Sequence, residues 1–92
     1  MKVLLTEPAE LHLDKIREFV GATSPRFADE LVERIRDRMK QIAEFPESGR
    51  LVPGAEALSL REVFESSYRI IYVVARDHIE VLGIIHGRRD LL

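Results

Sequence analysis

The spacing of the apolar residues changes once along this chain, near residue 58. Before that point apolar side chains recur every three or four residues, as in Ala9, Leu13 and Ile16, which is the spacing of one helix face. After it come runs rich in β-branched and aromatic residues, "YRIIYVVA" (68–75) and "IEVLGII" (79–85), which are typical of strands. Helices followed by strands in one chain favour an α+β fold, with helices packed on a sheet.

Two helices are predicted, and each follows a residue that can cap its first turn. Thr6 precedes the first helix, which ends at Gly21, and Ser24 precedes the second, which ends before Pro46. Because the break between them is short, the two should form an antiparallel hairpin. The apolar residues expected in the core from this half are Ala9, Leu13, Ile16, Phe19, Val20, Phe27, Ala28, Leu31, Val32, Ile35, Met39 and Ile42.

Four strands are predicted around this hairpin, which gives the order β-α-α-β-β-β. The short run "KVLL" precedes the helices, and a loop rich in proline and glycine, "PESGRLVPGAE", follows them. The predicted strands are 2–5, 60–66, 68–75 and 79–85. The fold expected is therefore a helical hairpin on a mostly antiparallel four-stranded sheet, in a single domain spanning residues 1–92.

Composition narrows the classes of function. The chain has 92 residues and no cysteine, so disulfides and thiolate metal sites are excluded and a cytoplasmic setting is expected. A net charge of −2 argues against binding nucleic acid through bulk charge, and no apolar run is long enough to span a membrane. No histidine or carboxylate cluster has metal-ligand spacing and no glycine-rich loop follows a strand, so no metal or other cofactor is expected.

Four segments, in this order and spacing, carry a resemblance to a known family. They are "IAEFPESGR" (42–50), "LREV" (60–63), "SYRIIYVV" (67–74) and "EVLGIIHGRRDL" (80–91). With them the chain resembles the ParE/RelE toxin superfamily of bacterial type II toxin–antitoxin and plasmid-stabilisation modules. The resemblance implies a toxin that is neutralised in a hetero-oligomer by a cognate antitoxin, whose C-terminal segment wraps it. One branch, RelE-like, contains ribosome-dependent mRNA endonucleases, and the other, ParE-like, contains inhibitors of DNA gyrase.

The residues favour the ParE-like branch. Cleavage of RNA through its 2′-hydroxyl needs a base, cations around the phosphate and an acid. Arg69 and Arg89 match arginines of the nuclease branch and His86 could act as a base, so these three are the catalytic candidates if the chain is a nuclease. However, the chain has six arginines and no lysine after residue 46, and the tyrosine of the nuclease branch would lie beyond Leu92. The resemblance therefore implies a gyrase inhibitor without catalytic residues; the alternatives are an mRNA endonuclease and a non-toxic homologue bound to an antitoxin.

Five residues are candidates for binding a target or an antitoxin: Arg61, Arg69, His86, Arg88 and Arg89. Each also has a purely structural interpretation. His86 could bond a backbone carbonyl at the end of the last strand, and the two terminal arginines could be solvated. Arg69 lies on an apolar face of its strand, where a charge is rarely unpaired. For Arg61 and Arg69, which lie on neighbouring predicted strands, the structural alternative is a buried or half-buried ion pair. The possible partners are Glu62, Glu65 and Glu80.

Two tyrosines lie on the other face of the same strand. Tyr68 and Tyr72 share that face with apolar residues, so both are expected in the core with their hydroxyls at its rim.

Overall fold

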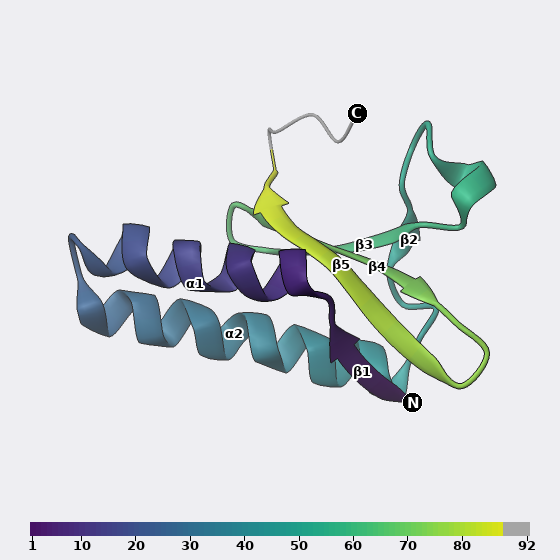
Figure 1. Cartoon of the computed structure of the whole chain (residues 1–92), viewed down its shortest axis with the longest axis horizontal. Helices are drawn as coiled ribbons and strands as arrows, with labels where there is room; N and C mark the ends of the chain where they lie inside the picture. Colours follow the sequence, from purple (N-terminus) through teal and green to yellow (C-terminus); the bar gives the residue numbers. More distant parts are fainter. Residues whose placement is uncertain (88–92) are drawn as a thin grey trace.

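The two helices pack side by side on one face of a twisted sheet, as Figure 1 shows, in a computed structural model that describes residues 1–87. The α+β fold and the helical hairpin predicted from the sequence are confirmed. The elements are β1 (Lys2–Leu5), α1 (Glu7–Gly21), α2 (Pro25–Glu44), β2 (Arg50–Leu51), the 3₁₀ turn η1 (Glu56–Leu58), β3 (Arg61–Glu65), β4 (Tyr68–Val74) and β5 (His78–His86).

Both helices begin at the predicted capping residues. The Thr6 hydroxyl accepts a hydrogen bond from the backbone N–H of Ala9 at 3.4 Å, and the Ser24 hydroxyl accepts one from Phe27 at 3.2 Å. Each bond satisfies an N–H that has no partner inside the helix. α2 ends at Glu44, just ahead of Pro46. Local sequence thus sets both ends of the hairpin.

The core lies between the hairpin and the sheet. The sheet contributes Ile70, Tyr72, Ile79, Val81 and Ile84, and the helices contribute Ala9, Leu13, Ile16, Leu31, Val32, Ile35, Met39 and Ile42.

Two aromatic residues predicted in this core are not in it. Phe19 is 78% exposed and Phe27 is 44% exposed. Both lie near the turn that joins the helices, where the hairpin extends beyond the sheet (Figure 1). The prediction was wrong for these residues because the helical stripe continues where no strand remains to cover it.

The sheet has five strands in the order β1-β5-β4-β3-β2, one more than predicted. β1 runs parallel to β5, and the other neighbours are antiparallel. The additional strand, β2, has only two residues and follows Gly49, so it gives no periodic signal in the sequence. A register shift opposite Ile71 and Tyr72 leaves Leu82 of β5 without a partner across the sheet. This bulge lets Val81 and Ile84 both face the core.

The start of α1 covers the edge of β5 where β1 has ended. Thr6 donates to the carbonyl of Val81 from both its backbone nitrogen, at 3.0 Å, and its hydroxyl, at 2.8 Å. Further along, the backbone N–H of Ile84 donates to Nδ1 of His12 at 3.2 Å. These contacts provide hydrogen-bond partners for backbone groups at the edge of β5 and fix the hairpin on the sheet. The helices cover one face of the sheet, and the opposite face carries a different set of side chains.

Candidate functional site

Four side chains form an arginine cluster on the face of the sheet opposite the helices: Arg50, Glu62, Phe64 and Arg69. The pairing of the strands brings them together, because Arg50 lies opposite Glu62 and Phe64 lies opposite Arg69. Residues directly opposite each other in antiparallel strands project from the same face and contact each other. The cluster therefore depends on three strands that are separate in the sequence.

Glu62 is the centre of the arginine cluster, and its side chain is 0% exposed. Its Oε2 accepts a hydrogen bond from Nε of Arg50 at 2.6 Å, and its Oε1 accepts one from Nη1 of Arg69 at 2.9 Å. The Arg69 side chain is 11% exposed, whereas that of Arg50 is 62% exposed. The guanidinium of Arg50 also lies over the ring of Phe64, 5.6 Å from its centroid. A buried carboxylate is thus paired with one largely buried and one exposed arginine.

The sequence predicted part of this arrangement. The ion pair of Arg69 with Glu62, one of three possible partners, is confirmed. Arg50 was not singled out, because its strand is too short to be recognised. The available signal was its place in the segment "PESGR" of the family resemblance.

Arg61 does not join the arginine cluster, although it is on β3 beside Glu62. It pairs with Tyr72, which places it on the face toward the helices. Its Nη1 donates to the backbone oxygen of Gly49 at 2.7 Å. The structure thus separates Arg61 from Arg69 and gives Arg61 a contact that supports the loop after α2.

Tyr72 also bonds the loop after α2, from the core side of the sheet. Its hydroxyl donates to the carbonyl of Pro46 at 2.8 Å and accepts from the backbone N–H of Gly49 at 2.9 Å. The prediction that Tyr72 belongs to the core is confirmed, since it is 0% exposed. The loop that leads to Arg50 is therefore held through its backbone by two side chains, the Tyr72 hydroxyl and the Arg61 guanidinium.

His86 ends β5 and is exposed. Its ring meets that of Tyr68 edge-on, with the centroids 5.8 Å apart. The next residue, Gly87, donates its backbone N–H to the carbonyl of Ser67 at 2.6 Å. A shallow hollow here is lined by Phe64, Ser66, Ser67, His86 and Gly87. The candidates Arg88 and Arg89 lie outside the described residues.

A second charged group lies at the other end of β5. His78 bonds the carboxylate of Asp77 through Nδ1 at 2.7 Å and that of Glu80 through Nε2 at 2.9 Å. Both ring nitrogens can donate only when the imidazole is protonated. The bond to Asp77, followed by the bond to Glu80, raises the pKa of His78 above its ordinary value of 6.5. Sequence analysis missed this group, although carboxylates at positions −1 and +2 from a strand histidine could have indicated it.

This group makes stability depend on pH. Because the pKa of His78 is raised in the folded chain, its stabilising contribution is complete below 6.5 and is lost as the pH rises through the folded-state value. We expect the melting temperature to exceed that of His78→Gln at about pH 6, and the difference to shrink by about pH 9. Thermal unfolding followed by circular dichroism measures both. A difference that stays constant with pH would contradict this assignment.

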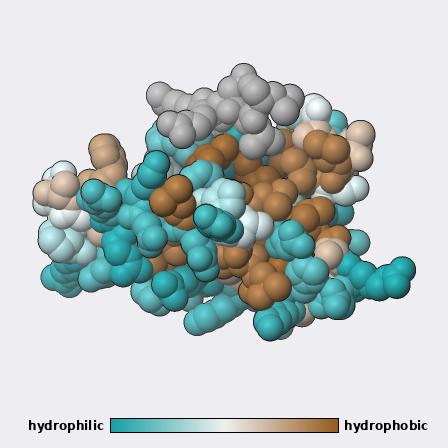
Figure 2. Space-filling view, in the orientation of Figure 1, coloured by the Kyte–Doolittle hydropathy of each residue, from teal (hydrophilic) through white to brown (hydrophobic). Residues whose placement is uncertain are grey.

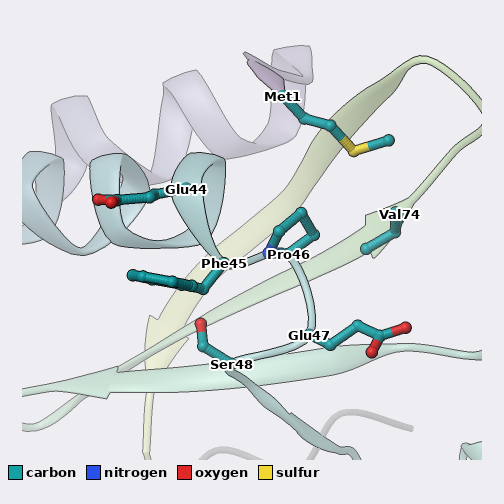
Figure 3. Close-up of a pocket in the computed structure, with 7 residues that line it drawn as sticks. All are labelled: Met1, Glu44, Phe45, Pro46, Glu47, Ser48 and Val74. Atoms are coloured by element: carbon teal, nitrogen blue, oxygen red, sulfur yellow. The ribbon is translucent and has the colours of Figure 1, made fainter.

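An apolar groove lies where α2 ends. Figure 3 shows Met1, Phe45, Pro46 and Val74 around it, with the carboxylates of two glutamates pointing away in opposite directions. Phe45 is 58% exposed. Figure 2 shows that hydrophobic surface also gathers over the strands, whereas the helices at the left present mostly hydrophilic surface. Exposed apolar surface of this kind commonly marks a site of protein contact.

Within residues 1–87, no group of three or more histidine, cysteine, aspartate and glutamate side chains could hold a metal ion. In that same part of the chain, no helix is long and apolar enough to cross a membrane.

Comparisons with known proteins agree with the fold and the family resemblance. The chain is 34% identical over 89 residues to Toxin RelE2 of Caulobacter vibrioides, and the aligned region covers 96% of this chain and 97% of that protein. It superposes on a chain of the chromosomal ParDE TA system from P. aeruginosa with a TM-score of 0.73 and 22% identity, over 94% of this chain and 95% of that one.

The assignment of the chain to a family rests on a sequence profile that matches almost the whole chain. The profile of the ParE toxin of type II toxin–antitoxin systems, parDE, covers residues 3–91. The resemblance stated from the sequence is thereby confirmed. This chain belongs to the ParE toxin family of type II toxin–antitoxin systems.

Proposed function

We propose that this toxin acts by binding its target, with DNA gyrase as that target, and that it has no catalytic residues of its own. In this proposal it works in the cytoplasm as a single domain, and a cognate antitoxin neutralises it in a hetero-oligomer. His86 and the arginines of the C-terminal segment, Arg88 and Arg89, contact the target or the antitoxin.

The observation that carries the proposal is the state of Arg69. In a nuclease this strand arginine would have to face the phosphate of the RNA. Here it is bound to Glu62 and its side chain is only 11% exposed. Removing it from that pair would leave a buried carboxylate with one exposed partner, at a cost of about 3–5 kcal/mol. With no lysine after residue 46 to replace it, the sheet has few cations for RNA cleavage.

Exposed apolar side chains support the partnership with an antitoxin. Phe45 is 58% exposed beside the groove at the end of α2, and Phe64 is 45% exposed beside the arginine cluster. The P. aeruginosa chain with a similar fold belongs to a chromosomal ParDE TA system. An antitoxin segment that covered these side chains would remove apolar surface from water, and the complex would be more stable than the toxin alone.

Endonuclease activity is the second candidate, and two observations favour it. The relative from Caulobacter vibrioides is named Toxin RelE2. In addition, His86 is exposed beside the hollow that contains Ser66 and Ser67, where a substrate group could approach a base. In that case His86 would act together with Arg69 and Arg89.

Expression in cells separates these functions. Induction of the toxin should arrest growth and leave reporter plasmids relaxed, because inhibited gyrase no longer restores negative supercoils. Primer extension on mRNA from the same cells should find no new 5′ ends. Codon-phased cuts that disappear in His86→Gln, with plasmid topology unchanged, would favour the endonuclease. Normal growth in the presence of folded toxin would favour the non-toxic homologue.

A further inference from the structure

Arg50 is the residue through which the arginine cluster reaches the surface. Its side chain is 62% exposed although its Nε is bonded to a fully buried carboxylate. The ring of Phe64 lies under the guanidinium, 5.6 Å from it, and is itself half-exposed. An arginine held by both contacts has lost much of its rotational freedom before any partner arrives. Binding to it therefore orders less side chain than binding to an unrestrained arginine.

Glu62 has no carboxylate oxygen left for a further arginine. Its Oε2 accepts from Nε of Arg50 and its Oε1 accepts from Nη1 of Arg69. Glu62 is the one carboxylate that the described part of the chain places on Arg50. A guanidinium has five N–H donors, so a second carboxylate can still be bound through the exposed ones, as a bidentate pair.

The surroundings favour a protein carboxylate over a phosphate backbone. Nucleic-acid binding relies on many cations spread along a surface, whereas this chain has a net charge of −2 and no lysine after residue 46. An arginine beside an exposed aromatic ring is instead typical of the few residues that dominate a protein interface.

We infer that Arg50 is a binding residue for the antitoxin and receives an aspartate or glutamate side chain of that partner. Glu62 and Phe64 are positioning residues that hold its guanidinium outward. The inference rests on the proposed partnership with an antitoxin, and it adds a residue outside the candidates found in the sequence.

The test is the affinity of the toxin for the antitoxin encoded in the adjacent reading frame, measured by isothermal titration calorimetry. Arg50→Gln should raise the Kd about tenfold or more. Arg50→Lys should recover only part of the loss, because lysine has no planar fork of donors. Arg26→Gln is the matched control: it removes the same charge from an exposed arginine that is also ion-paired, with Glu30, and it should leave the Kd unchanged.

A double-mutant cycle identifies the partner residue. Each antitoxin aspartate and glutamate is changed in turn to its amide, and one of these changes should weaken binding to the unsubstituted toxin but not to Arg50→Gln. Because Arg69 remains on Glu62, the Arg50→Gln chain should keep its circular dichroism spectrum. If it does not fold, Phe64→Leu decides instead: loss of the ring should weaken binding several-fold with every charge in place.

Several results would overturn the inference. It is wrong if Arg50→Gln binds within about twofold of the unsubstituted toxin, or is no weaker than Arg26→Gln. It is also wrong if Arg50→Gln does not fold and Phe64→Leu binds normally. An unsubstituted toxin that does not bind the antitoxin would overturn the proposed partnership, and the inference with it.

Discussion

Replacing Gly49 with alanine should lower the free energy of unfolding by about 3 kcal/mol, because no space exists for a methyl group there. A Cβ at this position would lie 2.5 Å from the hydroxyl oxygen of Tyr72 and 2.8 Å from the backbone oxygen of Glu62. The Tyr72 hydroxyl is bonded to Pro46 and to Gly49 itself, so it cannot move away without losing a hydrogen bond, and the Glu62 oxygen belongs to the backbone of β3. The loop would shift, and with it the backbone that carries Arg50. Urea denaturation followed by circular dichroism measures the change.

Gly21→Ala is the matched control for this substitution. Gly21 is the last residue of α1, and a Cβ there would meet only the Cβ of Ala28, at an ordinary 3.7 Å. Alanine is a better helix former than glycine, so stability should stay the same or rise slightly. Equal effects of the two substitutions would show that the close approach of Tyr72 to Gly49 is not a constraint.

Replacing Arg69 with leucine should lower the free energy of unfolding by about 3–5 kcal/mol. The reason is the carboxylate of Glu62, which is fully buried and would keep only its bond to the exposed Arg50. A second substitution, Glu62→Leu, should restore most of the stability of Arg69→Leu, because it removes the buried charge itself. Urea denaturation compares the unsubstituted chain, the two single variants and the double variant. Arg50→Gln is a control that leaves Glu62 paired with Arg69.

Additive losses would contradict this account. If Arg69→Leu and Glu62→Leu destabilise independently, the two residues do not form the coupled pair that the structure shows. The nuclease interpretation would then gain support, because Arg69 would be free to turn toward a phosphate. The expected coupling would instead show that Arg69 stabilises the sheet through its ion pair with Glu62.

The local parts of the fold were predictable because they depend on neighbouring residues. Thr6 and Ser24 each begin a helix through a bond to a backbone N–H three residues later. The two-residue period of the strands likewise identified the face that Arg69 shares with Ile71. The aromatic residues Phe19 and Phe27 were misplaced because a helical stripe says nothing about where the covering sheet ends.

The site was less predictable because it depends on the register of distant strands. Arg50 reaches Glu62 only through the pairing of β2 with β3, across a loop that contains Pro53 and Gly54. The pairing of β3 with β4 places Arg61 opposite Tyr72, on the face toward the helices and away from Arg69. Which face of the sheet each arginine occupies depends on this register, since a shift of one residue would exchange the two faces.

The most direct test of the proposed function is DNA supercoiling by purified gyrase in the presence of purified toxin. Supercoiling should fall as the toxin is titrated into the micromolar range and should recover when the cognate antitoxin is added. The same toxin preparation is also incubated with translating ribosomes as a test for mRNA cleavage. Inhibited gyrase with intact mRNA is the predicted result. Unchanged supercoiling, with cleavage of ribosome-bound mRNA by the same preparation, would contradict the account.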